Sequence, residues 1–170
     1  MKKFLLVPPI ILLIVGSWLL FKPQTAPITH EQPPTVQIPP ESEKFPLDAV
    51  NQLVELTNAE RIKAGLGALA VSSTLNQSAA DKCADMQVRN YWSHDTPDGQ
   101  SFDTFFYNRW GLGQVGENLV KSRYRPDDAV QAWMDSPTHK ANILGPYTRA
   151  GFAVCEGPQR HLIVQHLSQY

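Results

Sequence analysis

The chain has 170 residues, of which 42% are hydrophobic and 18% are charged. This is enough for one domain with its own hydrophobic core, and the length argues against two. The 15 Lys and Arg residues are balanced by 16 Asp and Glu residues, so the net charge is −1. A chain so close to neutral lacks the basic surface that follows a phosphate backbone, which argues against nucleic-acid binding.

A hydrophobic segment without any charge, residues 4–21, lies near the N-terminus, after two lysines and before a third. Its length suits a membrane-spanning helix, whereas a signal-peptide core has only about 7 to 15 apolar residues. The lysines in front of the segment favour a cytoplasmic N-terminus. We therefore predict a signal anchor at 1–22, with the C-terminal domain outside the cytoplasm. The alternative is a cleaved signal peptide and a secreted domain.

Residues 23–46 are rich in proline, with seven prolines among Gln, Thr and Glu and few bulky side chains. Such a segment buries too little apolar surface to offset the entropy lost on ordering. We predict a disordered, extended linker that separates the membrane from a folded domain at 47–170.

Two helices are predicted at the start of this domain. Apolar residues recur at three- and four-residue spacing in 47–62, and Gly65 follows as a suitable C-terminal cap. Ser72 or Ser73 is a suitable N-cap for the second helix, which places Cys83 on its inward stripe.

The next part of the chain contains turns and short elements. His94 lies between the end of the second helix and the turn-forming residues 95–99. A short helix is predicted over 102–107. The glycines of 111–116 then predict an irregular stretch that leads to Glu117.

The last third of the chain predicts two more helices and a hairpin. Pro126 begins one helix, and Pro137 begins a short one whose first turn carries His139, where the helix dipole favours a neutral imidazole. Residues 150–155 and 162–167 have β-type patterns and should pair as an antiparallel hairpin. Because helices precede strands without regular alternation, the predicted fold class is α+β, with helices covering an antiparallel sheet.

Four candidate site residues stand near tryptophans and turns: His94, Glu117, Asp135 and His139. Imidazoles and carboxylates on loops over a rigid scaffold are the groups from which metal or acid–base sites are built.

Six motifs between residues 47 and 170 resemble the CAP superfamily (cysteine-rich secretory proteins, antigen five and plant pathogenesis-related class one), in its bacterial SCP-domain form. The motifs are Leu56-Thr57-Asn58-Ala59-Glu60-Arg61, Trp92-Ser93-His94, Gly116-Glu117-Asn118-Leu119, Ala129-Val130-Gln131-Ala132-Trp133-Met134, Ser136-Pro137-Thr138-His139-Lys140-Ala141-Asn142-Ile143-Leu144 and Gly151-Phe152-Ala153-Val154. The resemblance implies an α-β-α sandwich with helices packed on a central antiparallel sheet. It also implies secretion and a cleft of two histidines and two acids that can hold a divalent metal.

Carried over by position, the resemblance assigns His94, Glu117 and His139 to the cleft. The second acid of the eukaryotic pattern falls on Ser136, one residue after Asp135. We therefore predict a three-group metal site of His94, Glu117 and His139, with Asp135 as a further cleft residue. Two imidazoles and one carboxylate suit zinc with an open position.

A structural role is the alternative for these residues. His94 and Glu117 would then hydrogen-bond to each other and to loop backbone, securing the loops over the core. We interpret His161 and His166, on the last strand, as sheet-face residues rather than ligands.

Cys83 and Cys155 are the only cysteines. Because an exported domain meets an oxidising or unprotected environment, we predict that these two inward thiols form a disulfide. The alternative is a pair of buried free thiols acting as small hydrophobic groups.

The predicted function is that of a membrane-anchored, extracytoplasmic CAP/SCP-domain protein. Its cleft would bind a divalent metal or small ligand, as a binding or interaction module at the cell envelope. The first alternative is a metal-dependent hydrolase of peptide or cell-wall material, with Glu117 as general base. The second is a lipid-binding protein. No Gly-x-Ser-x-Gly elbow is present, so covalent catalysis has no support.

Overall fold

One sheet forms the centre of the protein in a computed structural model that describes residues 48–107, 111–123, 125–157 and 160–170. In the order β1-β3-β4-β2, its strands are β1 (Ala70–Val71), β3 (Arg149–Cys155), β4 (His161–Ser168) and β2 (Val115–Ser122). The predicted hairpin of β3 and β4 is confirmed, and β2 adds antiparallel to β4. Only the two-residue β1 runs parallel to its neighbour, β3.

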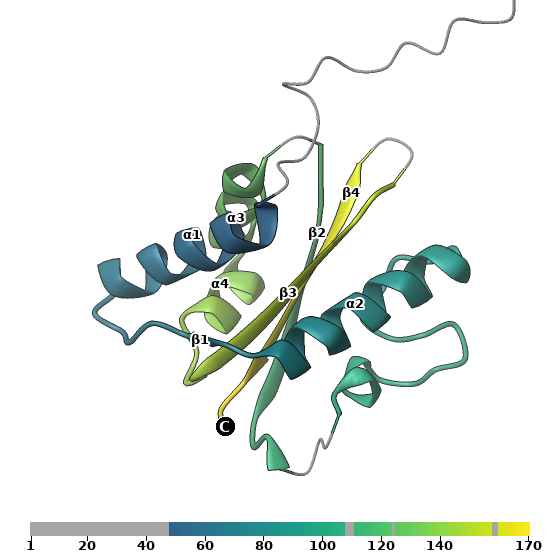
Figure 1. The fold of residues 1–170 in the computed structure, drawn as a ribbon, viewed down its shortest axis with the longest axis horizontal. Helices are drawn as coiled ribbons and strands as arrows, with labels where there is room; N and C mark the ends of the chain where they lie inside the picture. The colour runs from purple at the N-terminus through teal and green to yellow at the C-terminus, as the bar shows by residue number, and fades with distance from the viewer. Residues whose placement is uncertain (1–47, 108–110, 124, 158–159) are drawn as a thin grey trace, which may run out of the picture. The chain divides into compact units, whose positions relative to one another are not determined.

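Helices cover both faces of this sheet. They are α1 (Ala49–Lys63), α2 (Ser73–Val88), α3 (Pro126–Asp135) and α4 (Pro137–Ile143), with a 3-10 helix, η2 (Phe102–Phe105), where a short helix was expected. Figure 1 shows α2 on one side of the sheet and α1, α3 and α4 on the other. The predicted α+β class and the α-β-α sandwich implied by the resemblance are therefore confirmed.

Each face of the sheet has its own hydrophobic core. The larger core lies under α1, α3 and α4 and contains Leu53, Leu69, Ala129, Val130, Trp133, Ile143, Tyr147, Ala150, Phe152, Ile163 and Leu167. The smaller core, under α2, contains Ala79, Cys83, Met86, Leu119, Ala153 and Val164. Successive residues of β4 alternate between the two cores, because side chains of a strand point to opposite faces in turn.

The irregular stretch expected before Glu117 ends earlier than predicted, because β2 already begins at Val115. Gly116 weakens the strand pattern, but the eight residues of β2 pair with β4 throughout. A Cβ at Gly116 would lie 2.6 Å from the hydroxyl oxygen of Tyr147, so the glycine allows this close approach. Glu117 is consequently held on a rigid strand rather than on a loop.

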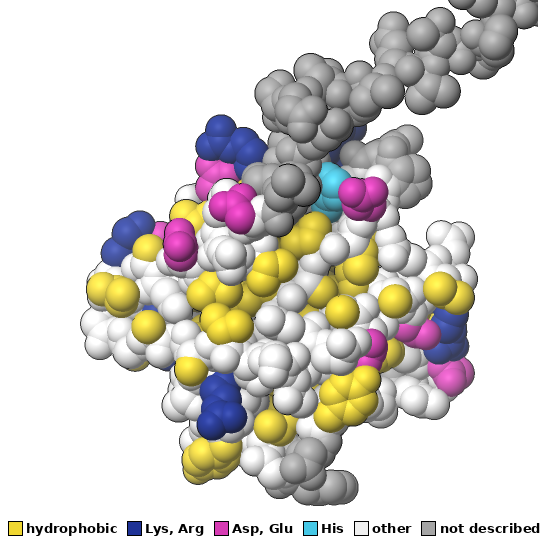
Figure 2. Space-filling model, viewed as in Figure 1, with side chains coloured by type: hydrophobic (Ala, Val, Ile, Leu, Met, Phe, Trp, Pro, Cys, Tyr) yellow, Lys and Arg dark blue, Asp and Glu magenta, His cyan; other side chains and the backbone are white. Residues whose placement is uncertain are grey.

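Beyond its short pairing with β1, the outer edge of β3 pairs with no further strand in the described part of the chain. Figure 2 shows apolar side chains gathered between α1 and α2 on the face where this edge lies. The side chain of Asn76 accepts a hydrogen bond from the backbone N–H of Phe152 at 2.9 Å. This contact occupies a donor that an open strand edge would otherwise offer to another chain.

The predicted anchor at 1–22 and linker at 23–46 lie outside the described residues. Within the described ranges, no helix combines the length and the apolar character needed to cross a bilayer.

The serines at the N-caps of α2 and α4 differ in their contacts, which gives a first test. Ser72 accepts a hydrogen bond from the backbone N–H of Leu75 at 3.3 Å, whereas Ser136, at the N-cap of α4, contacts the hydroxyl of Thr138 instead. We expect Ser72→Ala to lower the free energy of unfolding by about 1 kcal/mol in urea titrations. Ser136→Ala, the matched control, should lower it by clearly less. Equal losses would contradict the role of the Ser72 bond.

Candidate functional site

Glu117 stands at the centre of a chain of side-chain hydrogen bonds. Its side chain is fully buried, and each carboxylate oxygen contacts a different imidazole. Oε1 lies 2.6 Å from Nδ1 of His94, and Oε2 lies 3.0 Å from Nε2 of His166. An ionised carboxylate only accepts hydrogen bonds, so both of these ring nitrogens carry a proton.

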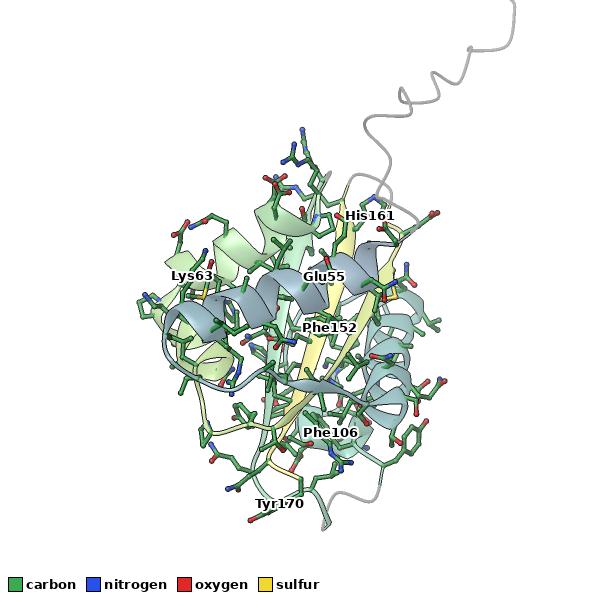
Figure 3. All side chains as sticks on the ribbon, turned by 60° about the vertical axis from the view of Figure 1, so that its left-hand side comes forward. Glu55, Lys63, Phe106, Phe152, His161 and Tyr170 are labelled. Carbon is green, nitrogen blue, oxygen red and sulfur yellow. A yellow bond between two sulfur atoms is a disulfide. The ribbon has the colours of Figure 1, made fainter. Side chains whose placement is uncertain are left out.

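The buried imidazole of His166 continues the chain towards α2. Its Nδ1 lies 2.7 Å from the hydroxyl oxygen of Ser78. The ring of Phe106 stacks on the imidazole with their centroids 4.2 Å apart, and Figure 3 labels this phenylalanine. The order of contacts, Ser78–His166–Glu117–His94, runs from the core to the surface, where His94 has 50% of its side chain exposed.

Sheet register and helix packing explain this arrangement. The pairing of β2 with β4 sets Glu117 directly opposite His166. Helix α2 crosses the same face and carries Ser78 and Lys82 on its buried stripe. The ammonium of Lys82 donates to the backbone carbonyl of His94, which fixes the loop that follows α2.

Burial and hydrogen bonding set the charges of the buried groups. Burial raises the pKa of Glu117, but hydrogen bonds from His166 and His94 outweigh burial, so the pKa is lowered overall. Burial lowers the pKa of His166, although its hydrogen bond to Glu117 opposes this shift. Burial also lowers the pKa of Lys82, while the nearby charge of Glu117 raises it. At neutral pH the buried pair is thus an ionised carboxylate and a neutral imidazole.

A group of amides joins α4 to β2 and so positions His139. The Nδ2 atom of Asn118 donates to the backbone carbonyl of His139 at 3.2 Å and to Oε1 of Gln165 at 2.8 Å. The Nδ2 atom of Asn142 donates to the backbone carbonyl of Glu117 at 3.0 Å. Burial lowers the pKa of His139, and the positive charge of a protonated His94 lowers it further.

The structure brings together only some of the predicted site residues. His94 and Glu117 are in direct contact, which the structural alternative also predicts. The backbone carbonyl of His139 is bonded to Asn118, the residue that follows Glu117 on β2. Asp135 points elsewhere: its carboxylate accepts from Gln131 on the exposed side of α3. On a helix, an offset of one residue from the motif position turns a side chain by about 100°. That rotation accounts for the placement of Asp135.

The three predicted metal ligands do not form a ready ligand cluster. Across the described ranges, no group of three or more His, Cys, Asp and Glu is placed to hold one metal ion. Both carboxylate oxygens of Glu117 are instead bonded to imidazoles. The direct contacts therefore make Glu117 an orienting partner of His94.

Sequence reasoning misses Ser78, Lys82 and His166 as parts of this site. The position of His166 on a sheet face is as expected, but its partner, Glu117, depends on a strand that the sequence pattern does not show. Ser78 and Lys82 do leave a signal, because they are polar residues four positions apart on the buried stripe of α2.

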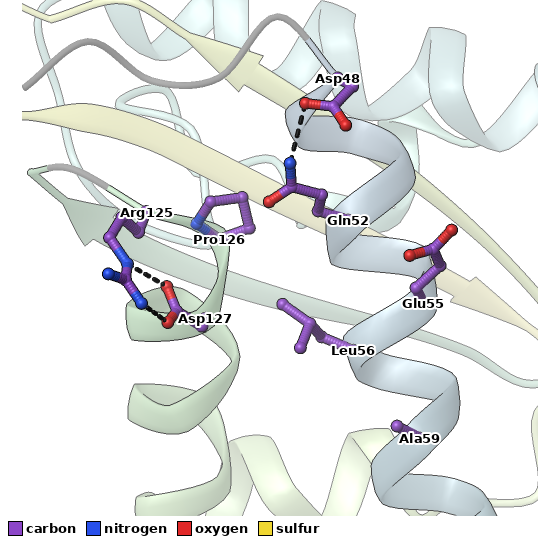
Figure 4. A pocket seen from close by; sticks show the side chains of 8 residues that line it. All are labelled: Asp48, Gln52, Glu55, Leu56, Ala59, Arg125, Pro126 and Asp127. Atoms are coloured by element: carbon purple, nitrogen blue, oxygen red, sulfur yellow. Dashed lines mark hydrogen bonds and ion pairs between the residues drawn. The ribbon is translucent and has the colours of Figure 1, made fainter. Parts of the chain in front are cut away.

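A separate groove of about 800 Å³ lies between α1 and α3 (Figure 4). It is lined by Asp48, Gln52, Glu55, Leu56, Ala59, Arg125, Pro126 and Asp127. Within it, Gln52 is bonded to Asp48 and Arg125 is paired with Asp127. These polar groups satisfy one another, and none of the predicted site residues lines the groove.

Comparisons with known sequences identify similar proteins. The sequence model of the cysteine-rich secretory protein family (CAP) matches residues 54–167. The uncharacterized protein YkwD of Bacillus subtilis is 38% identical over 133 residues, which cover 77% of this chain and 51% of YkwD. The uncharacterized membrane protein YlbC of the same organism is 29% identical over 113 residues, or 65% of this chain and 33% of YlbC. The chain thus spans about half the length of YkwD and a third of that of YlbC.

Solved structures share the fold. An outer surface protein from Borrelia burgdorferi superposes with a TM-score of 0.66 and 17% identity, over 72% of this chain and 93% of that one. An extracellular protein containing an SCP domain from Bacillus anthracis superposes with a TM-score of 0.62 and 26% identity, over 72% of this chain and 40% of that one.

Proposed function

The chain belongs to the cysteine-rich secretory protein (CAP) family, and on this premise we propose that it is an extracytoplasmic binding module. Its cleft at His94 would bind a divalent cation or a small ligand at the cell envelope. The similar Bacillus anthracis protein is described as extracellular and YlbC as a membrane protein, which supports this location. In the same proposal, residues 1–22 anchor the domain to the membrane.

The observation that carries the proposal is the contact between His94 and Glu117. Nδ1 of His94 is bonded to a buried carboxylate, while half of the side chain is exposed. With its proton on Nδ1, a neutral imidazole offers the lone pair of Nε2 to solvent. A carboxylate that holds a histidine in this way is the usual outer partner of a metal-binding imidazole.

His94 and His139 are the residues that would hold the cation. Two neutral imidazoles suit zinc, and the remaining positions would stay open to water or to an exchangeable ligand. Such an open site fits a binding module better than a closed structural site does. When bound, the cation would attract anionic or lone-pair groups of a ligand.

A serine hydrolase is not proposed, although Ser78, His166 and Glu117 have the contact order of a hydrolase triad. Ser78 is 0% exposed, as is His166, and Glu117 is 3% exposed. A nucleophilic serine has to reach a substrate carbonyl, and this hydroxyl lies inside the core between α2 and the sheet.

Zinc titration of the full chain by calorimetry tests the proposal. We expect His94→Ala to abolish measurable zinc binding, because it removes the oriented nitrogen. His139→Ala should also weaken zinc binding strongly, because it removes the second imidazole proposed to hold the cation. Asp135→Ala is the matched control and should bind like the unaltered chain. Unchanged affinity in His94→Ala, or no zinc binding by the unaltered chain, would contradict the proposed cation site.

A further inference from the structure

His166 is a buried polar residue whose ring contacts account for both of its nitrogens. Nδ1 contacts Ser78 at 2.7 Å, Nε2 contacts Glu117 at 3.0 Å, and Phe106 stacks on the ring. The smaller core around it is apolar, with Leu119 and Val164 in the neighbouring layer. An apolar side chain in this place would pack equally well but would leave Oε2 of the buried Glu117 without its donor. The polar contacts of His166 therefore call for a role beyond packing.

A carboxylate with only one hydrogen-bond donor is poorly fixed. The terminal torsion of glutamate is broad, so the plane of its carboxylate turns easily about the last carbon–carbon bond. At Glu117, His166 holds Oε2 from the core side while Oε1 faces His94. Donors at both oxygens lock the plane, and the lock keeps Oε1 in line with Nδ1 of His94.

The direction of the bond between His166 and Glu117 does not depend on the charge of His166. The ionised Glu117 has only lone pairs to offer, so Nε2 of His166 carries a proton in either charge state. The hydroxyl of Ser78 holds the opposite side of the ring, and the stacked Phe106 prevents the ring from tilting.

We propose that Ser78 and His166 are positioning residues that hold Glu117, so that His94 keeps its proton on Nδ1 and presents Nε2 to the ligand. This inference rests on the proposed function, in which Nε2 is the binding atom. On this view, the preference of the site for ligands that accept a lone pair, such as a divalent cation, depends on the buried contact between Ser78 of α2 and His166 of β4. Supporting side chains of this kind typically account for about 10- to 100-fold in metal affinity.

Two substitutions at position 166 separate positioning from packing. His166→Gln retains an N–H group where Nε2 lies, whereas His166→Leu retains bulk but removes the donor. The tautomer of His94 is read from long-range 1H–15N correlation spectra of the full, zinc-free chain. We expect the Nδ1–H form in the unaltered chain and in His166→Gln, and an increased share of the Nε2–H form in His166→Leu. Zinc affinity should fall by about 10- to 100-fold in His166→Leu and much less in His166→Gln.

The other outcomes are decisive as well. If His166→Leu keeps the Nδ1–H form of His94 and the zinc affinity of the unaltered chain, the positioning role is wrong. If His166→Leu does not fold, Ser78→Ala is measured in its place. It should raise the share of the Nε2–H form of His94 by a smaller amount than the loss of the His166 donor would. Unchanged His94 signals in Ser78→Ala would then overturn the inference. If the unaltered chain binds no zinc, the proposed function fails, yet the spectra still decide whether Ser78 and His166 position His94.

Discussion

Removal of the disulfide between Cys83 and Cys155 should lower the free energy of unfolding by about 4 kcal/mol, because the bond closes a long loop of the unfolded chain. The structure confirms the predicted bond, with a sequence separation of 72 residues and a Cα–Cα distance of 6.1 Å. It ties α2 to β3 across the smaller core. Without it, the unfolded chain regains the conformations that the closed loop forbids, while the folded chain gains little entropy.

Urea titration of the double variant Cys83→Ala, Cys155→Ala measures this loss. The unaltered chain in the presence of a strong reductant is the matched control and should unfold near the same urea concentration as the double variant. Alkylation provides a second readout, since the native, unreduced chain should have no reactive thiol. A midpoint that is insensitive to reductant would contradict the stabilising role of the bond.

Structural features that depend only on neighbouring residues, within one or two helical turns, can be predicted from the sequence. Ser72 caps α2 and Pro137 begins α4 because a cap and a proline act on their own turn. Cys83 faces inward because the apolar spacing of its helix defines one buried stripe. The same local logic explains why the β3 and β4 hairpin, with a short connection, is predictable.

Features decided by pairing between distant segments cannot be predicted in this way. Glu117 and His166 are 49 residues apart and meet only because β2 lies next to β4 in one register. Gly116 weakens the pattern of β2, so the sequence shows neither the strand nor its partner. The result is an expectation of three side chains that share one ion, whereas the carboxylate of Glu117 is bonded to imidazoles on both sides.

Arg61 makes the other contact with a large expected effect on stability. This buried side chain of α1 donates to four backbone carbonyls. They belong to Gly67 at 2.8 Å, Ile143 at 2.7 Å, Gly145 at 2.9 Å and Tyr147 at 3.0 Å. Three of these carbonyls lie at or just after the end of α4, where the helix dipole is negative and favours a cation. The guanidinium thus fixes the end of the helix that carries His139.

We expect Arg61→Met to lower the free energy of unfolding by at least about 4 kcal/mol, because several buried carbonyls lose their donor at once. Arg61→Lys should recover only part of this loss, since an ammonium is a single point whereas a guanidinium spreads five donors over a plane. Tryptophan fluorescence in urea reports the transition, because Trp133 is fully buried next to α4. Arg125→Met, which removes a solvent-exposed arginine, is the control and should change stability little. A loss at Arg61 no larger than that at Arg125 would show that these four contacts do not hold α4 in place.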